Sequence, residues 1–322
     1  MTKRVFRYDN AKFFLMFLVI LGHLLECISG NFTSVLYKAI YLFHMPAFIF
    51  LSGYFATFNA KRILGRMIIP YLVFQTIYLA FDAVVLEQHT GISLSYTTPY
   101  WLLWYLFVIV IYNLLIPFWD TEKPQNQMIV LIASVILSLL AGYDRSIGYF
   151  LSLSRLITFA PFFLSGFYLR KHMASYENSN FASSKWIPMI RVTAVIVCVA
   201  GIFYCWRVQL PSAALYGSYS YVDGGYSPVQ KLLLLIIGCA GIVCMHGISN
   251  TQIPIVSEIG KNTFPIYCLH GFAVRLLKKT HFFNHSEPVN LMLAVFLAAI
   301  MMLAFGNKVV CRLFATIFGN KK

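Results

Sequence analysis

Residues 13–30 read FFLMFLVILGHLLECISG, an apolar run of 18 residues that contains one histidine and one carboxylate. As an α-helix this run rises about 27 Å, at about 1.5 Å per residue. That length nearly matches the hydrocarbon core of a bilayer, which is roughly 30 Å thick. Similar runs recur along the whole chain. The sequence therefore predicts an all-α, polytopic integral membrane protein folded as a helical bundle.

The composition of the 322-residue chain also favours a membrane location. Hydrophobic residues make up 59% of the sequence, charged residues only 11%, and the mean hydropathy is +0.73. A soluble domain usually carries about 25% charged residues, so a surface this poor in charge needs lipid to cover it. Aromatic residues reach 17%, and many lie near the ends of the runs, as expected for rings at the headgroup level.

About ten transmembrane helices are expected, joined by short loops. The whole chain, 1–322, is therefore expected to form a single transmembrane domain with no soluble domain. The first run is expected to be retained rather than cleaved as a signal peptide, because it lacks a small-residue cleavage site. The predicted spans cover residues 13–30, 36–57, 66–86, 101–119, 127–143, 152–170, 187–205, 229–247, 263–280 and 289–306.

Lysine and arginine set the predicted orientation, since they are enriched in cytoplasmic loops. With ten spans, the main basic segments all lie on one side, so both termini are expected to be cytoplasmic and the protein to be multi-pass in the plasma membrane. Topology and anionic lipid explain the net charge of +14 without a nucleic-acid partner. Three cations at the predicted outer end of the ninth span, Arg275, Lys278 and Lys279, break the pattern. The cations that set the orientation are Lys3, Arg4, Arg7, Lys12, Lys61, Arg62, Arg66, Arg170, Lys171, Lys185, Lys308, Arg312, Lys321 and Lys322.

His23 is the clearest candidate for chemistry, because ionisable residues within membrane spans are costly and often functional. Lys12 precedes it by eleven positions. This spacing is three helical turns plus about 20°, so both side chains share one helix face, about 16 Å apart along the axis. With Lys12 at the cytoplasmic edge, His23 is expected near the middle of the membrane. A histidine hydrogen-bonded between helices for purely structural reasons would give the same pattern.

A second histidine and a carboxylate are expected near His23. His44 lies about 12 Å from the outer end of the second span, so the two histidines have similar predicted depth and could face one cavity. Pro46 is expected to kink that helix. Glu26 follows His23 by three residues and lies on a neighbouring part of the same face. It either orients the imidazole, as a carboxylate does for a general base, or faces water.

Cations near the ends of spans form a second group of candidates. Lys61 and Arg66 lie at the start of the third span and, with Lys12, outline a possible basic mouth on the cytoplasmic side. Positive-inside topology accounts for these residues equally well.

Two arginines lie where topology gives no reason for a cation. Arg155 and Arg275 fall in the outer parts of spans, where each is expected to bind an anionic group or to pair with Asp82 or Asp144. The longest predicted outer loop, about 206–228, is rich in Ser, Tyr and Gly. It is either a lid or wall of a polar pocket, or a plain connector.

One further histidine, His270, lies in the ninth span, where it is either a packed residue or a functional one.

Motifs for several other chemistries are missing from the sequence. There is no phosphate-cradling glycine loop, no HExxH, no Gly-x-Ser-x-Gly and no EF-hand pattern, so ATP-driven transport is unsupported. The seven cysteines occur singly, without Cys-x-x-Cys. Neither a disulfide framework nor a metal site is expected.

The chain resembles the acyltransferase-3 family of membrane O-acyltransferases. RYDNAKFFLMFLVILGH (7–23) resembles the first span of that family, with a basic residue, ten intervening residues and a histidine, and FHMPAFIFLSGY (43–54) resembles the second. RMIIPY, YWLLWYLFVIVIY, FFLSGFYLRKH and GKNTFPIYCLH resemble later segments in the same order. The likeness is to short members grouped with fucose 4-O-acetylases, so the extracellular esterase-like domain of longer members is not expected.

This resemblance implies transfer of an acyl group, usually acetyl, from cytoplasmic acyl-CoA to a hydroxyl of a sugar or an envelope polysaccharide. His23 would be the catalytic histidine, as general base or acyl carrier, with Lys12 as its motif partner. No cofactor is expected to stay bound, since acetyl-CoA is a donor substrate. The predicted roles are catalytic for His23, Glu26 and His44, CoA-binding for Lys12, Arg66 and Lys61, and acceptor-binding for Arg155, Arg275 and Ser52.

Two other functions fit the same pattern of spans and polar residues. An exporter of a glycan or lipid-linked sugar would also place polar groups at mid-membrane, but it predicts internal repeats, and none is evident in the sequence. A structural partner in a polysaccharide synthesis complex would carry out no chemistry.

Overall fold

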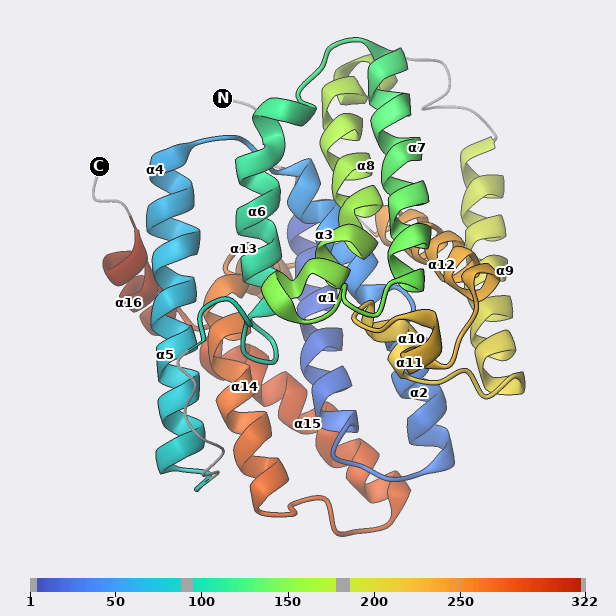
Figure 1. The fold of residues 1–322 in the computed structure, drawn as a ribbon. Coiled ribbons are helices and arrows are strands. Elements are labelled where there is room, and N and C mark those ends of the chain that lie inside the picture. Colours follow the sequence, from blue (N-terminus) through green and yellow to red (C-terminus); the bar gives the residue numbers. More distant parts are fainter. Residues whose placement is uncertain (1–4, 88–94, 178–185, 249, 320–322) are drawn as a thin grey trace. The chain divides into compact units, whose positions relative to one another are not determined.

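The computed structural model describes residues 5–87, 95–177, 186–248 and 250–319. Within these ranges every regular element is a helix (Figure 1), as the sequence predicts. Five of the cations used to predict the orientation lie outside the described residues. They are Lys3, Arg4, Lys185, Lys321 and Lys322.

The elements follow in chain order. They are α1 (Phe6–Leu25), α2 (Asn31–Tyr41), α3 (His44–Tyr54), α4 (Ala60–Ile63), the π-helical turn η1 (Leu64–Ile68), α5 (Ile69–Val84), α6 (Trp104–Trp119), α7 (Pro124–Leu140), the 3₁₀ turns η2 (Ala141–Tyr143) and η3 (Phe150–Ser152), α8 (Leu153–Glu177), α9 (Trp186–Arg207), α10 (Ala213–Tyr216), α11 (Tyr221–Gly224), α12 (Pro228–His246), α13 (Pro254–Lys261), α14 (Thr263–Lys279), α15 (Glu287–Phe305) and α16 (Lys308–Phe318).

In the described part of the chain, eight helical stretches are long and apolar enough to cross a membrane. Each overlaps one predicted span. The two other predicted spans correspond to α6, which has 16 residues, and α14, which has 17 and carries cations in its last turns. The fold is therefore that of a multi-pass membrane protein, and the count of ten stays a prediction. The eight stretches are Phe6–Leu25, Asn31–Tyr54, Ala60–Val84, Pro124–Tyr143, Phe150–Met173, Trp186–Arg207, Pro228–His246 and Glu287–Phe305.

Helix α1 begins seven residues earlier than predicted, because polar residues ahead of the apolar run are buried. Asn10 accepts a hydrogen bond from the hydroxyl of Ser257 at 2.7 Å and donates one to the carbonyl of Thr251 at 3.0 Å. Hydropathy alone cannot anticipate a turn whose polar groups are satisfied by a distant helix. The helix also ends at Leu25, before the predicted end at residue 30, so His23 lies in its last turn rather than near its middle.

The second predicted span, 36–57, is broken into two helices. α2 ends at Tyr41 and α3 begins at His44. Pro46 explains the break, because proline has no N–H to offer the carbonyl of Leu42, four residues earlier, and its ring would clash with that carbonyl. In α3 Pro46 occupies the first turn, where backbone N–H groups have no intrahelical partner anyway.

The chain forms two compact units, each built from separate stretches of sequence. Unit 1 contains Met1–Ile40, Lys61–Leu106 and Ile248–Lys322, and unit 2 contains Tyr41–Ala60 and Phe107–Gly247. The blue helix α1 and the orange-to-red helices α13 to α16 in Figure 1 belong to unit 1. Because the units interleave along the sequence, neither is a separate stretch of chain, and the single domain expected for the whole chain stays a prediction.

Helix α1 is the centre of unit 1. It packs against α13, α14 and α15, and side chains such as Leu15, Ile20 and Leu24 are fully buried. Helix α14 also contacts α5 and α16. These contacts bring the N-terminal and C-terminal segments of the chain together around α1.

The closest helix pair in unit 2 is α3 with α8. A Cβ atom on Gly53 would lie 2.0 Å from the carbonyl oxygen of Phe163, and one on Gly166 would lie 2.0 Å from the carbonyl oxygen of Phe50. The two glycines thus let the backbones approach each other from both sides, as small residues do at membrane helix interfaces.

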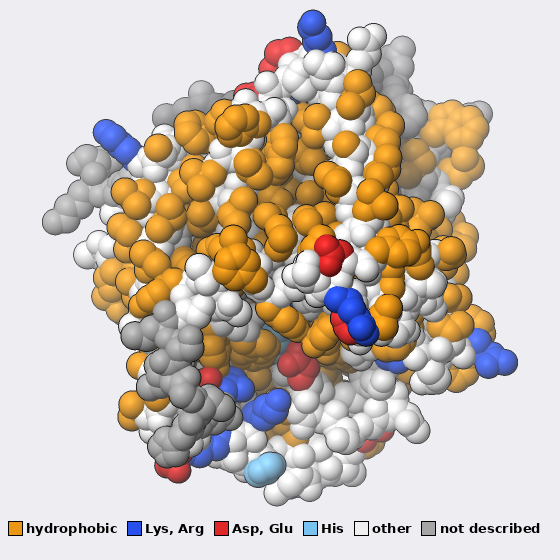
Figure 2. All heavy atoms as spheres, viewed as in Figure 1, with side chains coloured by type: hydrophobic (Ala, Val, Ile, Leu, Met, Phe, Trp, Pro, Cys, Tyr) orange, Lys and Arg blue, Asp and Glu red, His pale blue; other side chains and the backbone are white. Residues whose placement is uncertain are grey.

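Apolar side chains cover much of the molecular surface. Figure 2 shows orange hydrophobic side chains over most of the face drawn, with few charges among them. Helix α9 is an extreme case, because only 11% of its most apolar stretch is buried within the protein, although the mean hydropathy of that stretch is 2.1. A helix that is apolar all round and barely buried by protein is expected to face lipid. The C-terminal helix α16, which the sequence analysis did not anticipate, has no buried residue.

We expect Gly166→Ala to weaken the α3–α8 interface, because the added methyl group would overlap the backbone of Phe50. Overpacking of this kind costs about 1–3 kcal/mol, so thermal unfolding in detergent should occur at a lower temperature. Gly148→Ala is the control, since a Cβ there meets nothing within 4 Å. Equal melting temperatures for the two variants would contradict the interface.

Candidate active site

The imidazole of His23 lies against a carboxylate at the end of α1. Its Nδ1 is 3.2 Å from Oε1 of Glu26, and the same oxygen accepts a hydrogen bond from the hydroxyl of Tyr37 at 3.5 Å. The side chains of His23 and Glu26 are 15% and 27% exposed. The pair is therefore sheltered without being sealed from a substrate.

Local helix geometry explains why this pair forms. Glu26 is the C-cap of α1 and keeps right-handed helical angles, φ −61° and ψ −18°, so residues three apart are still neighbours. When Nδ1–H of His23 points at the carboxylate, Nε2 is the basic nitrogen of the ring. The arrangement is the one in which a carboxylate orients a general base.

Two rings from other parts of unit 1 lie beside the imidazole of His23. Trp101 meets it edge-on, with ring centroids 4.6 Å apart, and His270 is stacked on it at 5.7 Å. These contacts fix the plane of the imidazole. Trp101 comes from the segment before α6 and His270 from the middle of α14, so the cluster joins three distant stretches of the sequence.

His270 has a buried nitrogen without a hydrogen-bond partner. The residue is 0% exposed, and its Nδ1 lies 3.0 Å from the carbonyl oxygen of Ile266, one turn earlier. Nδ1 therefore carries the proton, while Nε2 is unsatisfied among the described residues. An unsatisfied buried polar atom is costly and needs an explanation. Its place next to His23 favours a functional residue over a packed one.

Cys27 adjoins the cluster but is not suited to act as a thiolate. Burial raises the pKa of this thiol, an effect only partly offset by the nearby ammonium of Lys278. The thiol is therefore protonated at neutral pH, and His23 is the better nucleophile or base.

Lys12, the predicted motif partner of His23, forms an ion pair on its own helix. Its ammonium lies 2.9 Å from Oδ1 of Asp9. The eleven-residue spacing holds within the continuous helix α1, so Lys12 and His23 are about 16 Å apart along the axis. Asp9 offsets part of the positive charge predicted for this end of the helix.

Lys61 and Arg66 are exposed residues of unit 1. Arg66 lies in the π-helical turn η1, and Pro70 accounts for that turn because it has no N–H for the carbonyl of Arg66. The N–H of Ile69 instead bonds to the carbonyl of Leu64. Such widened turns often occur at functional sites. A joint basic mouth of these residues with Lys12 stays a prediction.

Arg275 pairs with Asp82, which is one of the two alternatives that the sequence left open. One guanidinium nitrogen lies 3.0 Å from each oxygen of the Asp82 carboxylate, and the hydroxyl of Tyr100 donates to the same oxygens at 2.9 and 2.8 Å. Burial raises the pKa of Tyr100 above its ordinary value, which keeps the phenol protonated as a donor. This network neutralises Arg275 and weakens its predicted role in binding the acceptor.

His44 and Ser52 belong to α3 in unit 2. His44 is buried, and its ring contacts that of Tyr41 with centroids 4.7 Å apart. Ser52 donates its hydroxyl to the carbonyl of Phe48, one turn earlier. His23 lies in unit 1, and the shared cavity expected for the two histidines stays a prediction.

Arg155 ties the segment 206–228 to α8 within unit 2. Its Nε donates to the carbonyl of Tyr216 at 3.1 Å and Nη2 to the hydroxyl of Ser218 at 3.5 Å. The segment contains α10 and α11, and several of its side chains are buried in one cluster. It is therefore a packed wall of unit 2 rather than a plain connector.

Sequence analysis missed three polar or aromatic residues and left the role of a fourth open. Trp101 and Tyr37 gave no signal because aromatic residues are common throughout the chain, and Asp82 was noted only as a pairing option. Lys231 was absorbed into a predicted span. Among the described residues no group of three His, Cys, Asp or Glu side chains could hold a metal ion.

The helices and the polar cluster together define a class of protein. They describe a multi-pass membrane protein with a carboxylate–histidine pair at the end of its first helix. Such a pair can take a proton from a hydroxyl group, and it can also carry an acyl group covalently.

The chain belongs to the acyltransferase-3 family, described as an acyltransferase domain, which matches residues 5–306. It is similar to nodulation protein NolL of Sinorhizobium fredii, with 23% identity over 314 residues that cover 85% of this chain and 79% of the relative. Nodulation protein NolL of Mesorhizobium japonicum is also 23% identical, over 313 residues, 87% of this chain and 79% of the relative. No solved structure matches the chain. The family predicted from its segments is thereby confirmed.

We expect Glu26→Gln to slow acyl transfer at least about tenfold, because the neutral amide no longer stabilises the imidazolium that forms on His23. The measurement is the rate of transfer at saturating donor. Glu122→Gln is the matched control, since Glu122 is 88% exposed and pairs with Lys171 at the surface. Equal rates for both variants would argue against a role for Glu26.

We expect Asp82→Asn to lower the free energy of unfolding by about 3 kcal/mol, because it removes the carboxylate that pairs with the partly buried Arg275. Arg275→Met in the same chain should recover much of the loss. Chemical denaturation in detergent measures both. If Arg275→Met alone leaves stability unchanged and raises the acceptor KM instead, the arginine is a substrate-binding residue and the structural assignment is wrong.

Proposed function

We propose that this protein is an O-acyltransferase that moves an acyl group, acetyl in the first instance, from acyl-CoA to a hydroxyl group of a sugar or envelope polysaccharide. The observation that carries the proposal is the contact of His23 with Glu26, in a chain that belongs to the acyltransferase-3 family. Acetyl-CoA is the donor substrate and no resident cofactor takes part.

In the proposed reaction Nε2 of His23 removes the proton from the acceptor hydroxyl as its oxygen attacks the thioester carbonyl carbon. The new C–O bond forms and the C–S bond breaks. The CoA thiolate that leaves then takes the proton from the imidazolium. Glu26 stabilises that imidazolium, and the neighbouring rings of Trp101 and His270 hold its orientation. Transfer through an acyl-histidine on His23 is the alternative route.

His270 is proposed to position the substrate. Its Nε2 is buried, unprotonated and without a partner in the described part of the chain. It can accept a hydrogen bond from a second hydroxyl of the acceptor, beside the hydroxyl that donates its proton to His23. A substrate in this position would satisfy the atom and remove the cost of leaving it unpaired.

The donor is proposed to lie along α1, with the phosphates of CoA near Lys12 and its thioester near His23. The two residues share a face of one helix, and the extended pantetheine arm bridges the distance between them. Lys61 and Arg66 are proposed as further phosphate contacts, since both are exposed cations. His44, Ser52 and Arg155 keep their predicted roles as proposals.

The proposed location is the plasma membrane, with both termini in the cytoplasm where acyl-CoA is made. The distribution of lysine and arginine along the sequence supports this orientation. The exporter that shares the same sequence pattern is less favoured, because the family of the chain is one of acyltransferases.

The direct test is acetyl-CoA consumption by protein purified in detergent, with a crude glycan extract as acceptor. We expect His23→Ala to lose at least about 100-fold in rate, the usual contribution of a general base. His285→Ala is the control, because it removes an exposed histidine between α14 and α15. An active, folded His23→Ala variant would refute the assignment of His23, and a wild-type protein that neither binds nor consumes acetyl-CoA would refute the donor.

A further inference from the structure

Lys231 is a buried cation that the proposed chemistry does not use. It is the fourth residue of α12 and only 4% exposed, so its ammonium does not reach the surface as lysines in spans usually do. The first turn of a helix carries the positive end of the helix dipole, which further disfavours a cation there. Both effects make the position costly for the free protein.

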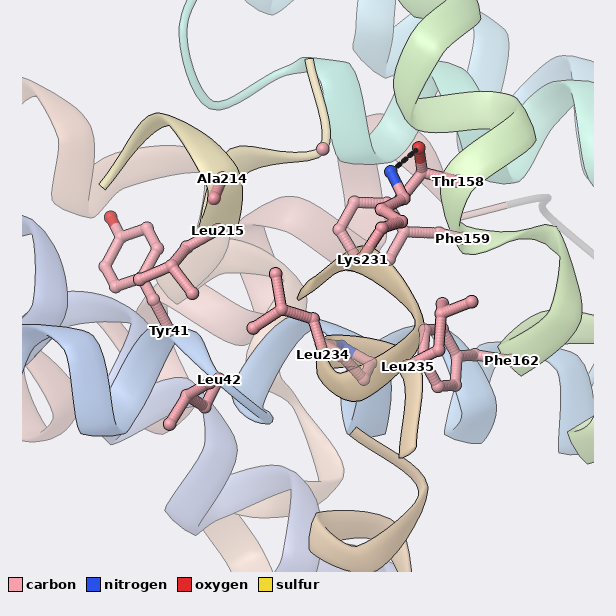
Figure 3. Close-up of a pocket in the computed structure, with 12 residues that line it drawn as sticks. Tyr41, Leu42, Thr158, Phe159, Phe162, Ala214, Leu215, Lys231, Leu234 and Leu235 are labelled. Atoms are coloured by element: carbon pink, nitrogen blue, oxygen red, sulfur yellow. Dashed lines mark hydrogen bonds between the residues drawn. The ribbon is translucent and has the colours of Figure 1, made fainter. Parts of the chain in front are cut away.

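Among the described residues the ammonium of Lys231 has a single partner. It donates to the hydroxyl of Thr158 on α8 at 2.8 Å (Figure 3). Lysine has three N–H donors, so two are unused among the described residues. No described carboxylate lies within ion-pair distance of the Lys231 ammonium. The acids of unit 2 that form ion pairs bind other cations, Lys171 or Arg145. They are Asp120, Glu122 and Asp223.

These two polar side chains open into a cavity of about 40 Å³ within unit 2. Figure 3 shows Lys231 and Thr158 side by side, with apolar and aromatic side chains making up most of the remaining wall. A space of this size admits a small polar group. The apolar and aromatic lining includes Tyr41, Phe159, Leu215 and Leu234.

The wall opposite α12 is held in place by α8. Ser154 donates its hydroxyl to the carbonyl of Gly217 at 2.9 Å, and Arg155 donates to the carbonyl of Tyr216 at 3.1 Å. Thr158 lies three residues after Arg155, on a neighbouring part of the same helix face. The cavity is therefore a built feature with a fixed wall, and a second cation lies one turn away along α8.

We propose that Lys231 and Thr158 bind a carboxylate group carried by an acidic sugar. The choice of a sugar as the carrier rests on the proposed function. A single ammonium balances a single negative charge, and a carboxylate is small enough to enter the cavity. One carboxylate oxygen accepts from Lys231 and the other from the hydroxyl of Thr158, in charge-assisted hydrogen bonds.

The proposal has a consequence for stability without ligand. Lys231→Met replaces a buried charge with an apolar side chain of similar length, so it should raise the melting temperature of the free protein. A functional site that costs stability is expected to behave in this way. A lysine kept for packing alone would show the opposite, a lower melting temperature.

The test is binding of glucuronate to the full chain in neutral detergent, measured by saturation-transfer NMR titration against neutral glucose. We expect glucuronate to bind more tightly than glucose, and Lys231→Met to weaken glucuronate at least about tenfold, as loss of a charge-assisted hydrogen bond does. Lys308→Met, which removes an exposed lysine of α16, should leave binding unchanged. Equal binding of glucuronate and glucose, or no effect of Lys231→Met, would overturn the proposal.

Two further arms separate the remaining outcomes. Glucose 1-phosphate and vesicles of phosphatidylglycerol are titrated in the same way, and Lys231-dependent binding of either in preference to glucuronate would overturn the carboxylate in favour of a phosphate or a lipid headgroup. Acetyl-CoA hydrolysis without acceptor is measured on the wild-type sample. If the wild type binds glucuronate through Lys231 but never consumes acetyl-CoA, the subsite stands and the proposed function fails.

Discussion

Polar groups within a bundle of apolar helices must be satisfied by the protein itself, because hydrocarbon offers no hydrogen bonds. This constraint organises unit 1. Asn10 is held by Ser257 and Thr251, and Asp82 is shared by Arg275 and Tyr100. The contacts of Asn10 with Ser257 and of Asp82 with Arg275 join segments far apart in the sequence, so satisfying the polar atoms also fixes which helices are neighbours.

The same constraint makes the exceptions informative. Nε2 of His270 is buried without a partner, and Lys231 is buried with one hydroxyl where a cation needs an opposite charge. Neither residue is explained by packing, because an apolar side chain would serve better at both positions. The first lies against His23 and the second lines a small cavity, so both are accounted for by groups that a substrate would bring.

The position of His23 also follows from packing rather than from hydropathy. Polar residues ahead of the apolar run are buried against α13, so α1 starts at Phe6, and it ends at Leu25, which places His23 in its last turn. There the imidazole meets the C-cap carboxylate of Glu26 directly, because Glu26 keeps helical angles and residues three apart are neighbours.

The sequence was sufficient for the features that depend on apolar length and on local spacing. Its apolar runs predicted the helical class and the approximate spans, and the three-residue spacing of His23 and Glu26 allowed for their contact. The break at Leu42 was foreseen only as a kink at Pro46, because a proline within a helical pattern either kinks the helix or ends it, and the sequence alone does not decide between the two. The contact of Arg275 with Asp82 joins residues 193 positions apart. It depends on tertiary packing, which cannot be read from a single sequence.

The central claim is that acyl transfer takes place at the imidazole of His23. It is tested most directly by determining the structure of the protein with a non-hydrolysable acetyl-CoA analogue, in which the thioester sulfur is replaced by a methylene group. The account predicts that the carbonyl carbon of the analogue lies within about 5 Å of Nε2 of His23, close enough for an acceptor hydroxyl to bridge them. A carbonyl carbon more than about 10 Å from that nitrogen, in a well-ordered complex, would contradict it.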